Sequence, residues 1–266
     1  MKLIICTLIT LFSLQSIASL LVTPSRVAFD VRDRSKEVIL VNTSNQVRSY
    51  KLEWVNQRQN DEGGYTQILE NEMESFGTAD QFLRYSPRRV TLQAGESQKV
   101  KVMARRRSNM SFPEYRSHLK FTALPPDLVN NSDEQETSEG ISMKLHLLLS
   151  YTIPVVLRTE APASKVTISD LSFSGEAANK QKLSFTMKKQ SPTSVYGDFT
   201  IYHIDNGEEK AIGFLNGVNF FHEQQTMRMS IPLHHALNQV KGQLKIVYKG
   251  TAEFADTIID ENSIML

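Results

Sequence analysis

The residues of this chain that are best suited to bind another molecule are basic and alternate along one predicted strand. Between Tyr115 and Phe121, Arg116, His118 and Lys120 share one face, because successive side chains of a strand point to opposite faces. An arginine fork binds a carboxylate through two parallel hydrogen bonds. The stripe therefore favours carboxylate binding, with Arg116 as the leading group, although a stripe that simply faces solvent would have the same pattern.

A long apolar stripe is the second unusual pattern. Every odd position of the segment 141–157 is apolar, namely Ile141, Met143, Leu145, Leu147, Leu149, Tyr151, Ile153, Val155 and Leu157. At ~3.3 Å per residue such a strand would exceed about 50 Å in length, whereas ordinary strands have about five or six residues. The segment is a long core strand, continuous or broken near Ser150, or two separate strands, or else a strand whose first half is an exposed edge offered to a partner. The polar segment 124–140 before it is expected to be a loop.

Residues that could perform catalysis or bind a metal do not form a recognisable constellation. His203, His222, His234 and His235 are scattered along the chain, and the single cysteine is Cys6. Ser117 and Ser194 lack the sequence context of a nucleophile. We expect no catalytic residue, no metal site and no cofactor, so a β-rich hydrolase is the weakest interpretation.

The N-terminal residues are typical of a secretory signal. Lys2 precedes an apolar stretch from Leu3 to Leu14, and small residues at Ser16 and Ala18 suit cleavage after Ala18 or Ser19. Cys6 lies inside this signal and comes too early to be a lipid attachment site. A second apolar stretch of ~20 residues does not follow, so we expect no membrane insertion.

Charge argues against nucleic acid as a partner. The net charge is +1, and the one basic run is Arg105 to Arg107. This run follows an alternating apolar strand, so we expect it to be a solvated strand end rather than a polyanion site.

The elements that must position these residues are nearly all strands. Short β-rich segments are separated by turns such as 42–45, 61–64 and 94–96, and Glu70 to Gln81 is the best helical candidate. The chain has 266 residues, of which 40% are apolar, and a proline-containing break spans Thr159 to Ala163. We predict an all-β chain with a signal over 1–19, one sandwich over 20–159 and a second over 160–266.

Five segments, in order along the chain, resemble PapD-like periplasmic chaperones of the chaperone–usher pathway. They are Val22–Asp30 (VTPSRVAFD), Ser86–Val102 (SPRRVTLQAGESQKVKV), Glu114–Phe121 (EYRSHLKF) with the following Leu124–Pro126, Ile153–Arg158 (IPVVLR), and Ser194–Asp198 (SVYGD). The sequences of the third and fifth segments are similar to those of the archaic, sigma-type branch of that family.

The resemblance implies a fold and a function. It implies two immunoglobulin-like sandwiches in an L-shaped or boomerang arrangement, located in the periplasm. Such a chaperone binds a pilus or fimbrial subunit that lacks its last strand, supplies that strand, and delivers the subunit to an outer-membrane usher; when free it can self-associate. The strand would present Met143, Leu145, Leu147, Leu149 and Tyr151 to the subunit.

The family also anchors the C-terminal carboxylate of the subunit on basic residues between its domains. Arg26 matches the anchor arginine of the opening strand. The second anchor of the best-known branch is a lysine, but the aligned position here falls near Thr152 and holds none. We predict that Arg116, with His118 and Lys120 on the same face, replaces it.

The alternative function is a secreted β-sandwich module that binds carbohydrate or acts as an adhesin. It would need an exposed aromatic platform. One tryptophan and eight tyrosines, spread along the chain, do not indicate such a platform.

Overall fold

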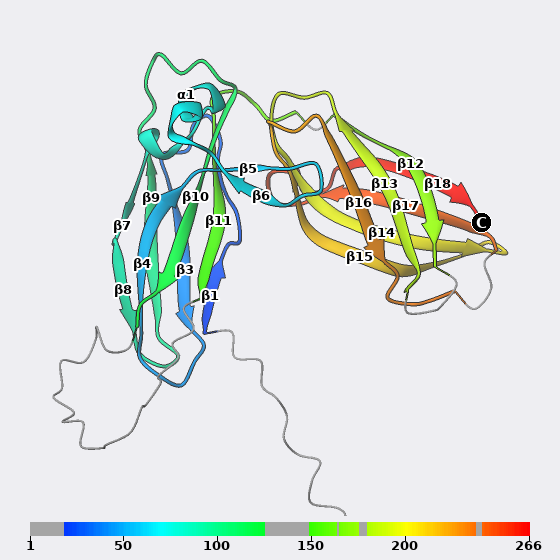
Figure 1. Cartoon of the computed structure of the whole chain (residues 1–266), viewed down its shortest axis with the longest axis horizontal. Coiled ribbons are helices and arrows are strands. Elements are labelled where there is room, and N and C mark those ends of the chain that lie inside the picture. The colour runs from blue at the N-terminus through cyan, green and yellow to red at the C-terminus, as the bar shows by residue number, and fades with distance from the viewer. Residues whose placement is uncertain (1–18, 126–148, 164, 176–179, 238–240) are drawn as a thin grey trace, which may run out of the picture.

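The computed structural model describes residues 19–125, 149–163, 165–175, 180–237 and 241–266. Strands dominate these residues, and they form two β-sandwiches, one from each half of the chain (Figure 1). The all-β, two-sandwich fold predicted from the alternating sequence is confirmed. The signal segment 1–18 and the residues 126–148, which include Met143, Leu145 and Leu147, lie outside the described residues.

The first sandwich consists of two sheets over one apolar core. One sheet has the order β1 (Leu20–Thr23), β3 (Ser35–Asn42), β9 (Ser97–Ala104), β7 (Leu83–Ser86). The other has the order β2 (Val27–Phe29), β11 (Ser150–Arg158), β10 (Glu114–Ala123), β4 (Arg48–Val55), β8 (Arg89–Leu92). Alternate residues of the strands, such as Val38, Leu119 and Val155, are fully buried between the sheets.

The second sandwich has its own core. Its sheets have the orders β12 (Val166–Ser174), β13 (Lys182–Lys189), β16 (Thr226–Pro232) and β15 (Glu208–Phe220), β14 (Val195–Asp205), β17 (Gln243–Gly250), β18 (Ile258–Met265). Phe199 stacks on Tyr248 with ring centroids 4.3 Å apart, and Phe185 lies 5.0 Å from Phe199. This aromatic cluster is separate from the core of the first sandwich.

The two sandwiches are inclined to each other and approach at one end, where a hairpin crosses from the first to the second (Figure 1). The hairpin pairs β5 (Gln57–Gln59) with β6 (Tyr65–Gln67) across the expected turn at 61–64. At its tip the carbonyl of Asp61 accepts a hydrogen bond from the N–H of Arg228 in β16, at 2.8 Å. The hairpin therefore belongs to the first half of the chain but joins both sandwiches.

The best helical candidate of the sequence, Glu70 to Gln81, forms only short helical turns. It consists of η1 (Glu70–Glu72), α1 (Met73–Phe76) and η2 (Asp80–Phe82). Gly77 ends α1 with φ of 74°, a left-handed conformation that stops a helix. A further 3-10 turn, η5 (Ala252–Phe254), lies between β17 and β18.

The basic run at 105–107 is only partly a solvated strand end. Arg105 and Arg107 are exposed, but Arg106 is half-buried and donates to the backbone carbonyls of Asp30, Asp33 and Arg158. The middle arginine therefore ties the turn after β2 to the end of β11. A charge run gives no indication of such a role, because carbonyl partners distant in the chain are not visible in the sequence.

Ser117 provides a test of how the turns over 77–82 are held on β10. Its buried hydroxyl accepts hydrogen bonds from the N–H groups of Ala79 and Asp80, both at 2.9 Å, and donates to Asn56 Oδ1 at 2.6 Å. Ser117→Ala leaves these three groups without a partner. We therefore expect the free energy of unfolding, measured by urea denaturation, to fall by about 1–3 kcal/mol or more.

The matched control is Ser230→Ala, which removes an exposed hydroxyl and should change stability by less than about 0.5 kcal/mol. Equal effects of the two substitutions would contradict this role of Ser117.

Candidate functional site

The predicted basic stripe on β10 is divided between two environments. Arg116 and His118 are 1% and 2% exposed, so they do not face solvent. Phe221 of the second sandwich packs against both, and Tyr65 of the β5–β6 hairpin packs against His118. Lys120 stays at the surface, where its Nζ lies 3.7 Å from Glu53 Oε1. The structure therefore brings Arg116 and His118 together at the junction of the sandwiches and leaves Lys120 outside it.

Arg26 lies at the same junction. It directly precedes β2 and is 6% exposed. Its Nη1 donates to Asn219 Oδ1 at 2.5 Å, and its Nη2 donates to Glu253 Oε1 at 3.0 Å. Its guanidinium also lies 5.2 Å from the ring of Tyr196. Both partners and the ring belong to the second sandwich, so Arg26 is already engaged between the domains.

A buried ion network that sequence reasoning missed surrounds Arg26. Arg158 ends β11 with its side chain fully buried, and its Nη2 donates to Glu253 Oε1 at 2.8 Å. Its Nε donates to Glu114 Oε2 at 3.2 Å. Glu114 in turn accepts hydrogen bonds from the N–H and the hydroxyl of Ser194. A glutamate and an arginine at the ends of two buried strands were the available signal in the sequence.

The network keeps Glu114 ionised. Burial alone would raise the pKa of Glu114, but His222, Arg158 and Arg26 outweigh it and lower the pKa to about 2. Burial also opposes ionisation of Glu253, and Arg26 and Arg158 again outweigh it, so its pKa is lowered. The junction therefore holds both carboxylates in their charged form.

Arg116 has a carboxylate partner of its own. Its Nη2 donates to Glu223 Oε1 at 2.5 Å and to the carbonyl of Gln57 at 2.9 Å. Its guanidinium lies 3.6 Å from the ring centroid of Phe221, a cation–π contact. The buried ring of His118 lies beside it, and burial together with the Arg116 charge lowers the pKa of His118 to about 3.

β11 presents a free edge to solvent over its first residues. On one side it pairs with β10 from Ser150 to Arg158, but on the other side β2 pairs with it only over Val155–Leu157. Within the part of the chain that the structure describes, no strand covers the outer edge of residues 150–153.

The exposure of the odd-numbered apolar side chains rises gradually from the end of β11 toward its beginning. Val155 is 0% exposed, Ile153 is 5% exposed, Tyr151 is partly buried against the core, and Leu149 is 45% exposed. From Ile153 to Arg158 every residue is buried, and the side chain of Arg158 contacts Glu253 and Phe254 of the second sandwich. The strand is thus a core strand at its end and an exposed edge at its beginning.

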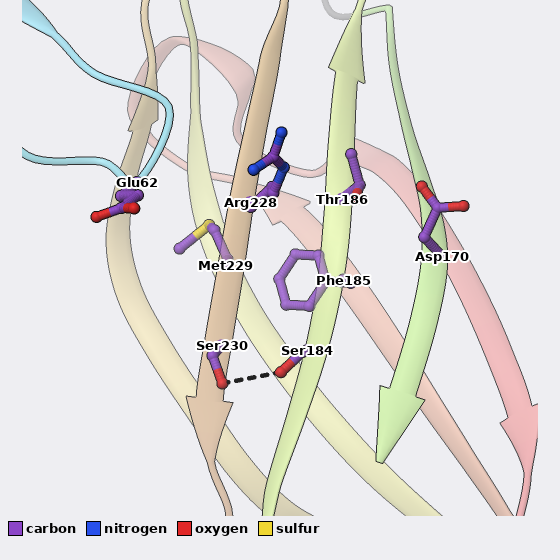
Figure 2. Close-up of a pocket in the computed structure, with 8 residues that line it drawn as sticks. All are labelled: Glu62, Asp170, Ser184, Phe185, Thr186, Arg228, Met229 and Ser230. Carbon is purple, nitrogen blue, oxygen red and sulfur yellow. Dashed lines mark hydrogen bonds between the residues drawn. The ribbon is translucent and has the colours of Figure 1, made fainter. Parts of the chain in front are cut away.

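A separate hollow of about 510 Å³ lies on the outer surface of the second sandwich (Figure 2). Its lining residues are Glu62, Asp170, Ser184, Phe185, Thr186, Arg228, Met229 and Ser230. Figure 2 shows Glu62 reaching it from the β5–β6 hairpin, while Ser184 and Ser230 hydrogen-bond to each other at 3.0 Å. The hollow shares no residue with the arginine junction.

Three further observations bear on the other functions considered. Among the described residues no group of three or more His, Cys, Asp or Glu could hold a metal ion. Within the same residues no helix is long and apolar enough to cross a membrane. The two large exposed aromatic residues found there, Tyr65 and Phe214, lie on β6 and β15 in different sheets, so they do not form one platform.

The buried junction predicts how stability depends on pH. The pKa of His118 in the folded chain, about 3, lies below the ordinary histidine pKa of 6.5, so between these limits the unfolded chain binds a proton that the folded chain does not. Stability must fall as the pH falls through that window. For Glu114 the corresponding window is 4.5 to about 2. We expect His118→Gln to show a shallower loss of Tm between pH 6.5 and 4.5 than the wild type, with both falling below pH 4.5.

The control is His235→Gln, since the side chain of His235 is exposed in the folded chain as it is in the unfolded chain. It should keep the slope of the wild type. A wild-type slope in His118→Gln as well would contradict the assignment of the upper window to His118.

No family model matches the chain, and no curated protein gives a significant match. Solved structures do align with it. The YadV chaperone is 14% identical with a TM-score of 0.46, over 93% of this chain and 100% of that one. The CupB2 chaperone of Pseudomonas aeruginosa is 12% identical with a TM-score of 0.47, over 92% and 98% of the two chains.

The structure of a CsuC–CsuE complex between a chaperone and a tip adhesion subunit, from archaic Csu pili of Acinetobacter baumannii, also aligns. The identity is 13% and the TM-score 0.46, over 93% and 98% of the two chains.

Proposed function

We propose that the chain is a non-enzymatic periplasmic chaperone, which binds pilus or fimbrial subunits by supplying a missing strand and delivers them to an outer-membrane usher. The observation that carries this proposal is the free outer edge at the beginning of β11. An unpaired edge that continues an apolar stripe is normally suppressed because it promotes aggregation. Where one persists, it suits the addition of a strand from a partner, or from a second copy when the chaperone is free.

The hydrogen-bonding direction of each β11 residue follows from the ladder. The N–H of Ala123 donates to the carbonyl of Leu149, and the N–H of Thr159 donates to the carbonyl of Pro113. In an antiparallel pair, residues that face the neighbouring strand alternate with residues that face away. Odd residues of β11 therefore bond to β10, while Ser150 and Thr152 point their backbone groups outward.

Arg26 marks where an added strand would end. β2 occupies the outer edge of β11 from Val155 onward, and Arg26 is the residue immediately before β2. A subunit strand lying along the outer edge of residues 150–153 meets Arg26 at the junction. A strand whose terminal carboxylate reaches Arg26 runs in the same direction as β11. Arg116, on the adjacent β10, supplies the second cation in place of the absent lysine.

The side chains proposed to enter the subunit are Met143, Leu145, Leu147, Leu149 and Tyr151. They have the same parity as Ile153, Val155 and Leu157, which lie in the core of the first sandwich. Burying the four from Met143 to Leu149 would contribute roughly 1.5–3 kcal/mol each, or about 6–12 kcal/mol gross. Ordering the strand and immobilising two proteins offset a large share of this.

One charged substitution on the apolar face should therefore abolish capture. Leu147→Glu is expected to prevent co-purification of the pilus subunit encoded beside the chaperone gene. Lys144→Glu and His146→Ser, on the opposite face, are the matched controls and should have mild effects. If the controls abolish capture while Leu147→Glu unfolds the free chaperone, the two faces are reversed. If none of the three changes matters, strand donation by this segment is wrong.

The outward backbone groups can be tested with proline, which has no N–H. Thr152→Pro removes an N–H that points away from β10, so we expect an almost unchanged Tm and a loss of subunit capture. Tyr151→Pro removes an N–H that bonds to Phe121, so it should lower the Tm markedly. Full capture by a folded Thr152→Pro protein would argue against strand addition at this edge.

A further inference from the structure

A loop of the second sandwich covers the two arginines. Loop 221–225 connects β15 to β16, and its first residue, Phe221, is 0% exposed although it belongs to neither hydrophobic core. The ring centroid of Phe221 lies 3.6 Å from the guanidinium carbon of Arg116 and 5.8 Å from that of Arg26. Two residues later, Glu223 brings its carboxylate to Arg116. The loop thus places an aromatic ring and a carboxylate on the cations proposed to anchor a subunit.

The pairing at this point is incomplete. Glu223 Oε1 accepts hydrogen bonds from Arg116 and from the N–H of Gln59, but Glu223 Oε2 is buried without a hydrogen bond. The Nε atoms of Arg26 and Arg116 are also buried without a partner. Buried polar groups are normally satisfied. The site therefore has unused donors for a carboxylate with better geometry than that of Glu223.

The carboxylate of Glu253 is harder to separate from the arginines than that of Glu223. Its Oε1 accepts hydrogen bonds from both Arg26 and Arg158, and Arg158 is held in turn by Glu114. Removing Glu253 would leave two buried arginines without this partner. Removing Glu223 takes the carboxylate from one arginine, Arg116, together with its contacts to the N–H of Gln59 and to His222 Nδ1, which lies 3.6 Å from Glu223 Oε2.

We propose, on the basis of the function given above, that Glu223 is a resident carboxylate exchanged for the C-terminal carboxylate of the incoming subunit. Leaving Arg116 buried without a counter-charge would be strongly destabilising. Loop 221–225 is therefore displaced readily only by a ligand that brings its own carboxylate. Glu223 thereby makes the site selective for a free chain terminus and keeps the arginines covered until one arrives.

Gln59 of the β5–β6 hairpin holds the loop in place. Its side chain donates to the carbonyl of Asn219 at 2.9 Å and accepts from the N–H of Phe221 at 3.3 Å. Its backbone N–H donates to Glu223 at 2.8 Å, and its carbonyl accepts from the side chain of Gln224. Gln59→Ala removes the side-chain part of this clamp without changing any charge.

The test compares two forms of one peptide on the full-length protein. The probe is a fluorescent peptide of the C-terminal strand of the pilus subunit that co-purifies with the wild type, ending either in a free carboxylate or in an amide. Its Kd is measured by anisotropy for the wild type, Glu223→Gln and Gln59→Ala. The control is Glu208→Gln, which makes the same charge change at an exposed residue of β15. The Tm of each variant is recorded alongside.

We expect Glu223→Gln to bind the carboxylate form at least about ten-fold tighter than the wild type, a difference of about 1.4 kcal/mol. The amide form should gain much less, and Glu208→Gln should bind both forms as the wild type does. Gln59→Ala should also bind the carboxylate form more tightly, and it decides the question if Glu223→Gln does not fold.

Equal gains for carboxylate and amide would overturn the exchange, as would wild-type affinities in both Glu223→Gln and Gln59→Ala. If the wild type captures no subunit and binds neither peptide, the proposed function itself fails, and the exchange fails with it.

Discussion

Three arginines buried between the two sandwiches impose the constraint on which the rest of the structure depends. Arg26, Arg116 and Arg158 come from the first half of the chain, and each pairs with a carboxylate of the second half, either Glu253 or Glu223. Separating a buried pair leaves an uncompensated charge, which costs far more than an exposed ion pair contributes. The relative position of the sandwiches is therefore fixed by charge pairing as well as by apolar contact.

The same constraint explains why β11 is buried at its end and has an open edge at its beginning. Its end is buried on both faces, and there Arg158 pairs with Glu253 of the second sandwich. Its beginning extends beyond the reach of β2 and keeps an open edge. A strand that is firmly held at one end can present its other end without unfolding the domain. The basic residues and the free edge thus lie on neighbouring strands of one sheet, with Arg26 just before β2, Arg116 on β10, and Arg158 and the free edge on β11.

The alternation of apolar residues was sufficient to predict the all-β fold, and the proline-containing break pointed to two sandwiches. Arg26 was singled out by the resemblance of its segment to the family's opening strand, and Arg116 by the alternation of basic residues along β10. Glu114, Arg158, Glu223 and Glu253 were missed, because a buried ion pair between residues distant in the chain leaves no local pattern. The hairpin at 57–67 was missed as a bridge for the same reason, since only its turn has a sequence signature. Glu70 to Gln81, the best helical candidate in the sequence, forms only short helical turns, because Gly77 interrupts it.

The central claim is that the outward backbone groups of Ser150 and Thr152 bond to a strand of the captured subunit. Amide hydrogen exchange at single residues, measured by NMR on the free chaperone and on its complex with a subunit, tests this most directly. The account predicts fast exchange at Ser150 and Thr152 in the free protein and strong protection in the complex, while Tyr151 and Ile153 are protected in both. Unchanged fast exchange at Ser150 and Thr152 in a stable complex would contradict it.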